Sequence, residues 1–373
     1  MSETVGRRIA DQDGHVATQA SRLNKLRQFL AAQDDLAFLI SGLPNVRYLT
    51  GFSGSSGYLL VTPDNVTLFT DGRYEIQARQ QTRGIEILVS TSNVLSSVVE
   101  ELRRRRIRRL GFERNRTSYQ SYEFLRRELR GRKFVGLDGI VEQQRAVKGP
   151  EELSRIRAAV ELNSRAFDLA CGKVRPSWTE VRFAAEIEYQ MKLLGASKPA
   201  FDTIVASGAR SALPHASPQP VRLERDAPIV VDQGAILDDY VSDMTRLACL
   251  GRLPGRQRVV YQAVCEAQAA AIEAVKAGVK AHSVDRKARQ VLKKFKLDKA
   301  FSHSTGHGLG LEIHEPPRIG PREDVRLLSG MVITIEPGAY LEGVGGVRIE
   351  DVVVVTATGC EVLTKAPREV REL

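Results

Sequence analysis

Apolar residues recur at two different periods along the first 140 residues. Over residues 21–32 (SRLNKLRQFLAA), Leu23, Leu26 and Leu30 have the spacing of one helix face. Short apolar runs broken by glycine and proline follow, and they predict strands in LAFLIS, YLTGF, GYLLVT and VTLFTD. A second helix is predicted near residues 74–81. This order of helix and strand predicts a compact α/β unit.

A polar stretch over residues 138–152 (DGIVEQQRAVKGPEE) separates this unit from a second one. Beyond it, Leu153, Ile156 and Val160 recur at helical spacing. Amphipathic helices are predicted at 182–194, 256–276 and 283–295, and they alternate with the β-rich stretches PIVVD, VSDMTRLACL, VITIE and VRIEDVVVVT. We therefore predict an α/β (α+β) protein of two domains, 1–140 and 141–373.

Composition narrows the class of protein. The chain has 373 residues, of which 42% are hydrophobic, so it can bury a large core and is neither disordered nor a disulfide miniprotein. Its four cysteines are far apart and form no Cys-x-x-Cys pair, which fits a reducing compartment. No segment resembles a signal peptide or approaches the ~20 apolar residues of a membrane span. We expect a cytoplasmic protein without a membrane partner.

The net charge of +10 is concentrated in one window. Residues 101–133 contain 13 basic and 4 acidic residues, whereas the rest of the chain has 42 basic and 41 acidic residues. We interpret the window as the solvated faces of two helices around a strand that begins at Gly111, because Leu102, Ile107 and Leu110 supply an apolar stripe. Nucleic acid is the alternative partner for this window, and we do not expect it to be the main one.

Two acidic residues lie on neighbouring predicted strands. Asp232 ends PIVVD, and Asp243 lies in VSDMTRLACL. If the two strands form a hairpin centred on Leu237 and Asp238, Asp232 and Asp243 are directly opposed. Opposed residues have Cβ atoms about 4.5–5.5 Å apart. Two carboxylates would then face each other.

A second pair of acids is placed symmetrically about a turn further along the chain, where Glu336 and Glu350 are equidistant from Gly343. Glu336 ends VITIE, and Glu350 shares one strand face with Arg348. Like charges about 4 Å apart repel by roughly 4 kcal/mol at an effective dielectric of ~20, so four such acids need compensation. Two divalent cations would balance four carboxylates in charge.

Histidines gather near these acids. His303, His307 and His314 lie within FSHSTGHGLGLEIHE, and with His215 they make four of the six histidines in the chain. The glycines around His307 argue against the helix of a zinc-protease motif. Imidazole beside carboxylates is instead typical of a site in which several titratable groups converge on bound metal.

At this point the residues resemble a known family. The order Asp232, Asp243, His307, Glu336, Glu350, in the settings VDQGA, SDMTR, GHGLGLEIHE, TIEPGAY and GVRIED, resembles the dinuclear metallopeptidases of the pita-bread fold. The closest resemblance is to the Xaa-Pro peptidases, aminopeptidase P and prolidase. The segments GLPNVRYLTGFSGSSG and LFTDGRYEIQA resemble the creatinase-type N-terminal domain of that branch. The resemblance implies a small N-terminal α/β domain and a C-terminal domain with a curved antiparallel sheet flanked by helices.

The resemblance also implies a role for each residue. Asp232 would bind one metal, Asp243 and Glu350 would bridge both, and His307 with Glu336 would complete the second. Glu336 would also pass the proton of the attacking water to the leaving proline nitrogen. The implied substrate-contacting residues are His215, His303, His314, Tyr340 and Arg348, among which His303 and His314 would stabilise the tetrahedral intermediate. Ligands without thiolate suit Mn²⁺, Co²⁺ or Zn²⁺, and the family implies Mn²⁺ and a homodimer.

Several functions are compatible with these residues. The TGFSGSSG and TDGRYEIQA segments favour aminopeptidase P, which removes the residue before proline from longer peptides, over a prolidase restricted to dipeptides. A methionine aminopeptidase would not need the first ~140 residues. A creatinase works without metal, and the five ligand residues disfavour it. A noncatalytic binding protein of the same fold is supported only by the Arg-rich window.

Overall fold

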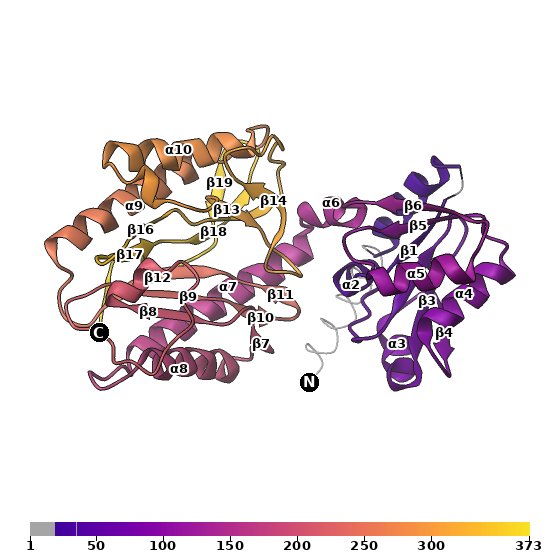
Figure 1. Cartoon of the computed structure of the whole chain (residues 1–373), viewed down its shortest axis with the longest axis horizontal. Helices are drawn as coiled ribbons and strands as arrows, with labels where there is room; N and C mark the ends of the chain where they lie inside the picture. The colour runs from indigo at the N-terminus through magenta and orange to yellow at the C-terminus, as the bar shows by residue number, and fades with distance from the viewer. Residues whose placement is uncertain (1–18, 35) are drawn as a thin grey trace, which may run out of the picture. The chain divides into compact units, whose positions relative to one another are not determined.

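A computed structural model of the chain describes residues 19–34 and 36–373. It divides into two compact units, Met1–Arg145 (unit 1) and Ala146–Leu373 (unit 2). Unit 1 contains a six-stranded sheet in the order β4-β3-β2-β1-β5-β6 (Figure 1). Its strands are β1 (Ala37–Ile40), β2 (Tyr58–Val61), β3 (Val66–Asp71), β4 (Glu86–Ser90), β5 (Arg109–Glu113) and β6 (Lys133–Leu137). The pairs β1–β2 and β2–β3 are antiparallel, and the other three are parallel.

Helices of unit 1 pack on this sheet through apolar faces. Residues 19–31 are helical, as their periodicity predicts. The other helices are α2 (Leu43–Thr50), η1 (Gly72–Tyr74), α3 (Glu75–Gln81), α4 (Val94–Arg104), α5 (Tyr119–Glu128) and α6 (Ile140–Ala146). Leu95, Val98 and Leu102 of α4 pack with Leu125 of α5 against the strands. The unit therefore has its own core, as an independent α/β domain requires.

The predicted strand in YLTGF is wrong, because its first three residues belong to helix α2. Pro44 lies in the first turn of this helix, where its missing N–H costs nothing. Gly51 ends it in the left-handed conformation, with φ of 79°. An apolar run this short does not distinguish a strand from a helix, because its period is not decisive.

The Arg-rich window folds into the end of α4, the strand β5 and the helix α5, as predicted. Many of its arginines form ion pairs within unit 1. Arg104 and Arg105 both pair with Glu101, and Arg103 pairs with Glu128. Arg109 pairs with Asp34 outside the window. Part of the charge that the composition concentrates here is thus neutralised by neighbouring carboxylates.

Unit 2 is built on two larger sheets and two small ones. A four-stranded sheet has the order β20-β12-β9-β8, and a five-stranded sheet has the order β14-β13-β15-β18-β19. The small sheets are β11-β10-β7 and β16-β17. The strands are β7 (Lys198–Pro199), β8 (Ile204–Ser207), β9 (Ile229–Gln233), β10 (Ala235–Leu237), β11 (Tyr240–Val241), β12 (Met244–Cys249), β13 (Gly306–Gly308), β14 (Glu315–Ile319), β15 (Val332–Ile335), β16 (Gly338–Leu341), β17 (Gly345–Arg348), β18 (Asp351–Val355), β19 (Cys360–Val362) and β20 (Arg371–Glu372).

Two pairs of helices cover these sheets from opposite sides (Figure 1). The helices are α7 (Pro150–Cys171), α8 (Glu180–Leu193), η2 (Gly208–Ala212), α9 (Gly255–Glu273), α10 (Ala281–Lys294) and η3 (Asp298–Ala300). The pair α7 and α8 packs on β9 and β12 through one core cluster, and the pair α9 and α10 packs on β15, β17 and β18 through a second. The helices predicted at 182–194, 256–276 and 283–295 are confirmed as α8, α9 and α10. None of the helices in the described residues is long and apolar enough to cross a membrane.

A buried arginine joins the two larger sheets. Arg246 of β12 and Asp351 of β18 form an ion pair at 2.6 Å, and both side chains are 1% exposed. Arg246 also donates to the main-chain oxygens of Glu350 and Ala366. Asp351 accepts further bonds from Gln268 and Arg368. Both carboxylate oxygens of Asp351 and both terminal nitrogens of Arg246 therefore have partners, as the burial of charge demands, whereas Arg246 Nε has none among the described residues.

We predict that Asp351→Asn destabilises the metal-free protein by about 3–5 kcal/mol, because it leaves the buried Arg246 charge without its partner. Arg157→Met is the matched control, since Arg157 and Glu361 form an ion pair whose side chains are 43% and 49% exposed. Its removal should cost no more than about 1 kcal/mol. Denaturant unfolding measures both changes, and equal costs for the two variants would contradict this ranking.

Candidate metal centre

The hairpin between β9 and β12 has a register that differs from the predicted one. Asp232 lies opposite Thr245, so the expected direct pairing of Asp232 with Asp243 is wrong. The turn consists of Asp238 and Asp239, whose φ values of 45° and 76° fit a two-residue hairpin turn one position later than predicted. The resulting shift is two residues, and it leaves Asp243 on the same face as Asp232 because side chains alternate with period two.

The second pair of strands has the predicted register. Ile335 pairs with Asp351 between β15 and β18, and Gly338 pairs with Arg348 between β16 and β17. Both pairs are symmetric about Gly343, which is the symmetry predicted for Glu336 and Glu350. The predicted register is therefore confirmed. Gly343 itself has φ of 71°, which suits the tight connection of β16 to β17. Both glutamates lie where the chain passes from one sheet to the next.

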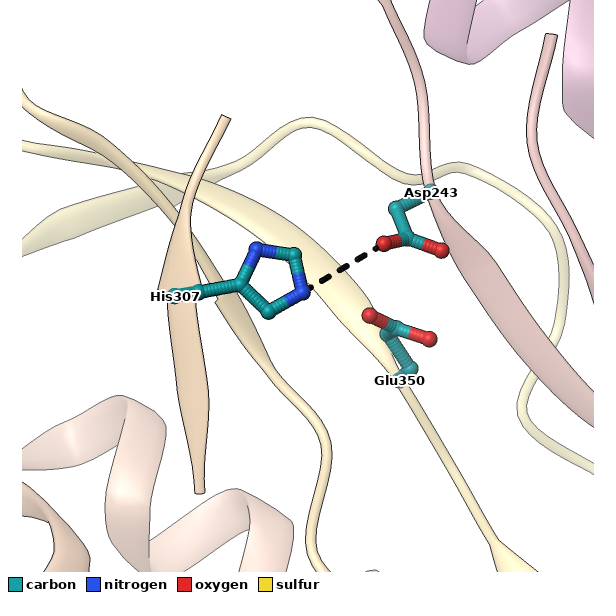
Figure 2. Close-up of side chains that lie close together, drawn as sticks. All are labelled: Asp243, His307 and Glu350. Atoms are coloured by element: carbon teal, nitrogen blue, oxygen red, sulfur yellow. Dashed lines mark ion pairs between the residues drawn. The ribbon is translucent and has the colours of Figure 1, made fainter. Parts of the chain in front are cut away.

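Acidic side chains from the two larger sheets converge on His307 of β13. Ligand atoms of Asp243, His307 and Glu350 all lie within 4.8 Å of one another (Figure 2). Figure 2 shows the imidazole of His307 pointing at the two carboxylates. Its Nε2 is 3.6 Å from Asp243 Oδ2 and 3.4 Å from Glu336 Oε1. Four of the five predicted ligand residues therefore meet at one point.

The main-chain oxygen of Gly308 determines which tautomer neutral His307 adopts. Its Nδ1 lies 3.0 Å from the main-chain oxygen of Gly308, which can only accept a hydrogen bond. Nδ1 therefore carries the proton, and Nε2 presents its lone pair to the carboxylates. Burial also lowers the pKa of His307, which favours this neutral form. A neutral imidazole with a free Nε2 is the form that binds metal.

The carboxylates are held in an environment that opposes their charge. Burial, followed by the repulsion of Asp232 and Glu336, raises the pKa of Asp243 well above its usual range. Burial and then Asp243 do the same to the pKa of Glu350. Burial raises the pKa of Glu336 to about 7, although Arg348 acts in the opposite direction. A divalent cation among them would remove this conflict.

Two oxygens of the site lack partners within the described chain. Asp232 Oδ1 and Glu350 Oε1 are both buried and accept no hydrogen bond from any described residue. An unpaired buried carboxylate oxygen is costly unless an ion or a donor completes it. Oxygen and nitrogen donors without sulfur suit divalent ions such as Mn²⁺, Co²⁺ and Zn²⁺. The residues present therefore fit a metal centre.

Arg348 organises the other side of the site. Its guanidinium donates to Asp232 Oδ2 at 2.5 Å and to the hydroxyl of Tyr340 at 2.6 Å. The Tyr340 hydroxyl in turn lies 2.9 Å from His303 Nε2. Because His303 Nδ1 faces the main-chain oxygen of Ser304, Nε2 accepts the Tyr340 proton. Burial lowers the pKa of His303 to about 4, so the ring is neutral here.

The remaining predicted histidines lie at the exposed side of this site. His314 is exposed and packs edge-on against His307, with ring centroids 4.4 Å apart. Burial of part of its ring, followed by repulsion from His307, lowers the pKa of His314. His215 is exposed in the turn after η2, and electrostatic interaction with it contributes to lowering the pKa of both His303 and His314. The structure thus brings all the predicted site residues into one neighbourhood.

Two threonines of the site were missed by the sequence-based reasoning as functional candidates. Thr245 donates to Glu350 Oε2 at 2.7 Å, and Thr334 donates to Glu336 Oε1 at 3.2 Å. Each lies two positions from a predicted ligand, Asp243 or Glu336, on the same strand face. That spacing is the signal that could have identified them. Threonine is so common in strands that the spacing has little weight without the structure.

Comparisons with known proteins agree with this geometry. The family model "metallopeptidase family M24" matches residues 154–357, and the creatinase/prolidase N-terminal domain matches residues 22–147. The Xaa-Pro dipeptidase of Pyrococcus horikoshii is 36% identical over 350 residues, which cover 93% of this chain and 98% of that protein.

Solved structures show the same fold. A Xaa-Pro dipeptidase from Bacillus anthracis superimposes with a TM-score of 0.92 at 34% identity, over 95% of this chain and all of that one. An X-Pro aminopeptidase from Thermotoga maritima gives a TM-score of 0.85 at 38% identity, over 91% of this chain and 98% of that one. Unit 2 thus has the pita-bread fold that the sequence motifs imply, preceded by a creatinase-type domain. With both domain types matched in order and the ligand residues gathered in the second, the chain belongs to metallopeptidase family M24.

Proposed function

We propose that this chain is a dinuclear metal-dependent exopeptidase that hydrolyses the bond between an N-terminal residue and proline. The observation that carries the proposal is the convergence of Asp243, His307 and Glu350 within 4.8 Å, with unpaired carboxylate oxygens beside them. Relatives named as Xaa-Pro dipeptidases support the substrate class. Their similarity extends over both domains, including the N-terminal one.

Five residues would hold the two ions: Asp232, Asp243, His307, Glu336 and Glu350. Bound there, divalent ions supply Lewis-acid polarisation of the scissile carbonyl and lower the pKa of a water molecule towards ~7. We propose Mn²⁺ as the native metal. Oxygen-rich sites with a single imidazole are compatible with it, and the fully buried Glu350 provides a hard, anionic donor.

Glu336 is the residue proposed to move the proton. Thr334 donates to its Oε1 at 3.2 Å, which fixes the carboxylate beside His307. From this position Glu336 would accept the proton of the attacking water and deliver it to the proline nitrogen as the peptide bond breaks. The leaving amine needs that proton, because an amide anion is a very poor leaving group.

Five further residues would contact the substrate or hold the contacting side chains in place: His215, His303, His314, Tyr340 and Arg348. The donor chain from Arg348 through Tyr340 to His303 fixes the His303 ring on the site. His314 is exposed and packs edge-on against His307, one of the proposed metal ligands. We propose that His303 and His314 orient the peptide and stabilise the oxyanion of the tetrahedral intermediate.

Dipeptides are the proposed main substrates. The TGFSGSSG and TDGRYEIQA segments favour aminopeptidase P, but relatives named Xaa-Pro dipeptidase match the chain over almost its whole length. Cleavage of longer peptides is the second candidate function. The Thermotoga maritima structure, which is 38% identical and named an X-Pro aminopeptidase, supports it.

We predict that the chelated protein is inactive and that Mn²⁺ restores hydrolysis of Xaa-Pro dipeptides more strongly than of Xaa-Pro-Xaa tripeptides. The assay compares both substrates at equal concentration with Mn²⁺, Co²⁺ and Zn²⁺ in turn. A clear preference for tripeptides would establish the aminopeptidase P alternative. Activity that survives exhaustive chelation would refute the metal-dependent mechanism itself.

The variants His307→Ala and Glu336→Gln are each expected to lose at least about 100-fold in kcat/KM, since each removes a ligand and Glu336→Gln also removes the proton carrier. His282→Ala is the matched control, because His282 lies on α10 and pairs with Asp324 instead of facing the site. It should retain normal kinetics. Near-normal turnover by either site variant would exclude that residue from the centre.

In the metal-free protein, burial raises the pKa of Glu336 from 4.5 to about 7. The folded state therefore binds this proton more tightly than the unfolded state, and the resulting stability is present below pH 4.5 and lost as the pH rises to about 7. Glu336→Gln cannot ionise and escapes this loss. Its free energy of unfolding, measured without metal, should rise relative to wild type across this window.

Saturating Mn²⁺ should make the wild-type protein more stable than Glu336→Gln at pH 7. The metal stabilises the native wild-type protein by mass action and binds the variant more weakly. A difference between the two proteins that is independent of pH would contradict the assigned burial of the Glu336 charge.

A further inference from the structure

The two proposed bridging carboxylates come from different sheets. Asp243 immediately precedes β12 of the four-stranded sheet, and Glu350 immediately precedes β18 of the five-stranded sheet. Their spacing therefore depends on what joins the sheets at this point. One main-chain bond does so, from the Glu350 N–H to the Thr245 oxygen at 3.1 Å. The side chain of Thr245 adds a second link at the same place.

The hydroxyl of Thr245 is fully buried and has two charged partners. It lies 3.0 Å from Arg348 Nε and 2.7 Å from Glu350 Oε2. A guanidinium can only donate, so the hydroxyl accepts from Arg348 and must give its single proton to Glu350. The direction of both hydrogen bonds is thereby fixed, and the Glu350 carboxylate is held by one defined oxygen.

A chain of hydrogen bonds connects the carboxylates of Asp232 and Glu350. Arg348 also binds Asp232 Oδ2, so Asp232, Arg348, Thr245 and Glu350 form one continuous chain of hydrogen bonds. The observed register makes the chain possible, because it places Thr245 opposite Asp232 on β9. At both ends of the chain the second carboxylate oxygen, Asp232 Oδ1 or Glu350 Oε1, has no partner in the described chain.

We propose that Thr245 is a positioning residue for the metal centre, which holds the Glu350 carboxylate so that its unpaired oxygen faces the ions. The inference rests on the proposed metal-dependent function. Partners behind metal ligands typically change metal affinity by 10–100-fold when they are removed. A threonine that served packing alone would affect folding stability and leave the metal affinity unchanged.

The test is equilibrium Mn²⁺ binding to the metal-free protein, followed through the electron paramagnetic resonance signal of free Mn²⁺. Thr245→Val keeps the shape and removes the hydroxyl, and its dissociation constant should rise about 10–100-fold. Thr245→Ser restores the hydroxyl and should bind Mn²⁺ nearly as wild type does. If the valine variant does not fold, Thr245→Ala takes its place in the same titration.

Thr364→Val is the control for a structural loss. Thr364 is a buried threonine of unit 2 whose hydroxyl accepts from the Val352 N–H. Its replacement should lower the free energy of unfolding without changing the Mn²⁺ affinity. Wild-type affinity in Thr245→Val, or equally weak binding by the valine and serine variants, would overturn the proposal. Absence of Mn²⁺ binding by the wild-type protein would instead overturn the metal centre itself.

Discussion

Mutual repulsion among buried carboxylates is the constraint on which unit 2 depends. Asp243 and Glu350 are at most 5% exposed, and their pKa values are raised because burial and neighbouring acids both disfavour the charge. Strands otherwise made of valine, isoleucine and leucine would not hold such a cluster for its own stability. Cations or bound protons would relieve this repulsion, so metal binding would be coupled to the folding of this region.

The surrounding scaffold keeps the proposed ligands in place by means of positively charged side chains and a main-chain acceptor. Arg348 pairs with Asp232, and Arg246 pairs with Asp351 directly behind Glu350. The main-chain oxygen of Gly308 selects the tautomer of His307. Each interaction acts on the geometry of a proposed ligand and leaves Asp232 Oδ1, Glu350 Oε1 and His307 Nε2 available to ions, which is the arrangement that a preorganised metal site would require.

Much of this site could be predicted because strand residues alternate and hairpins are symmetric. The pairing about Gly343 followed from sequence positions alone, since a tight glycine-rich connection fixes the register. The pairing of Asp232 was misplaced because nothing in the sequence marked Asp238 and Asp239, rather than Leu237 and Asp238, as the turn. Helix α2 was missed because a short apolar run has no decisive period. Contacts between sheets, such as that of Thr245 with Glu350, join residues 105 positions apart and leave no local trace.

We propose that the converging acids and His307 form a dinuclear metal centre. Anomalous diffraction from crystals grown with Mn²⁺ tests it most directly, because it locates each ion independently of activity. Two anomalous peaks are expected about 3.5–4 Å apart, both next to Asp243 and Glu350, with His307 beside one of them. Crystals without a peak between these residues, or with Mn²⁺ bound only elsewhere on the chain, would contradict it.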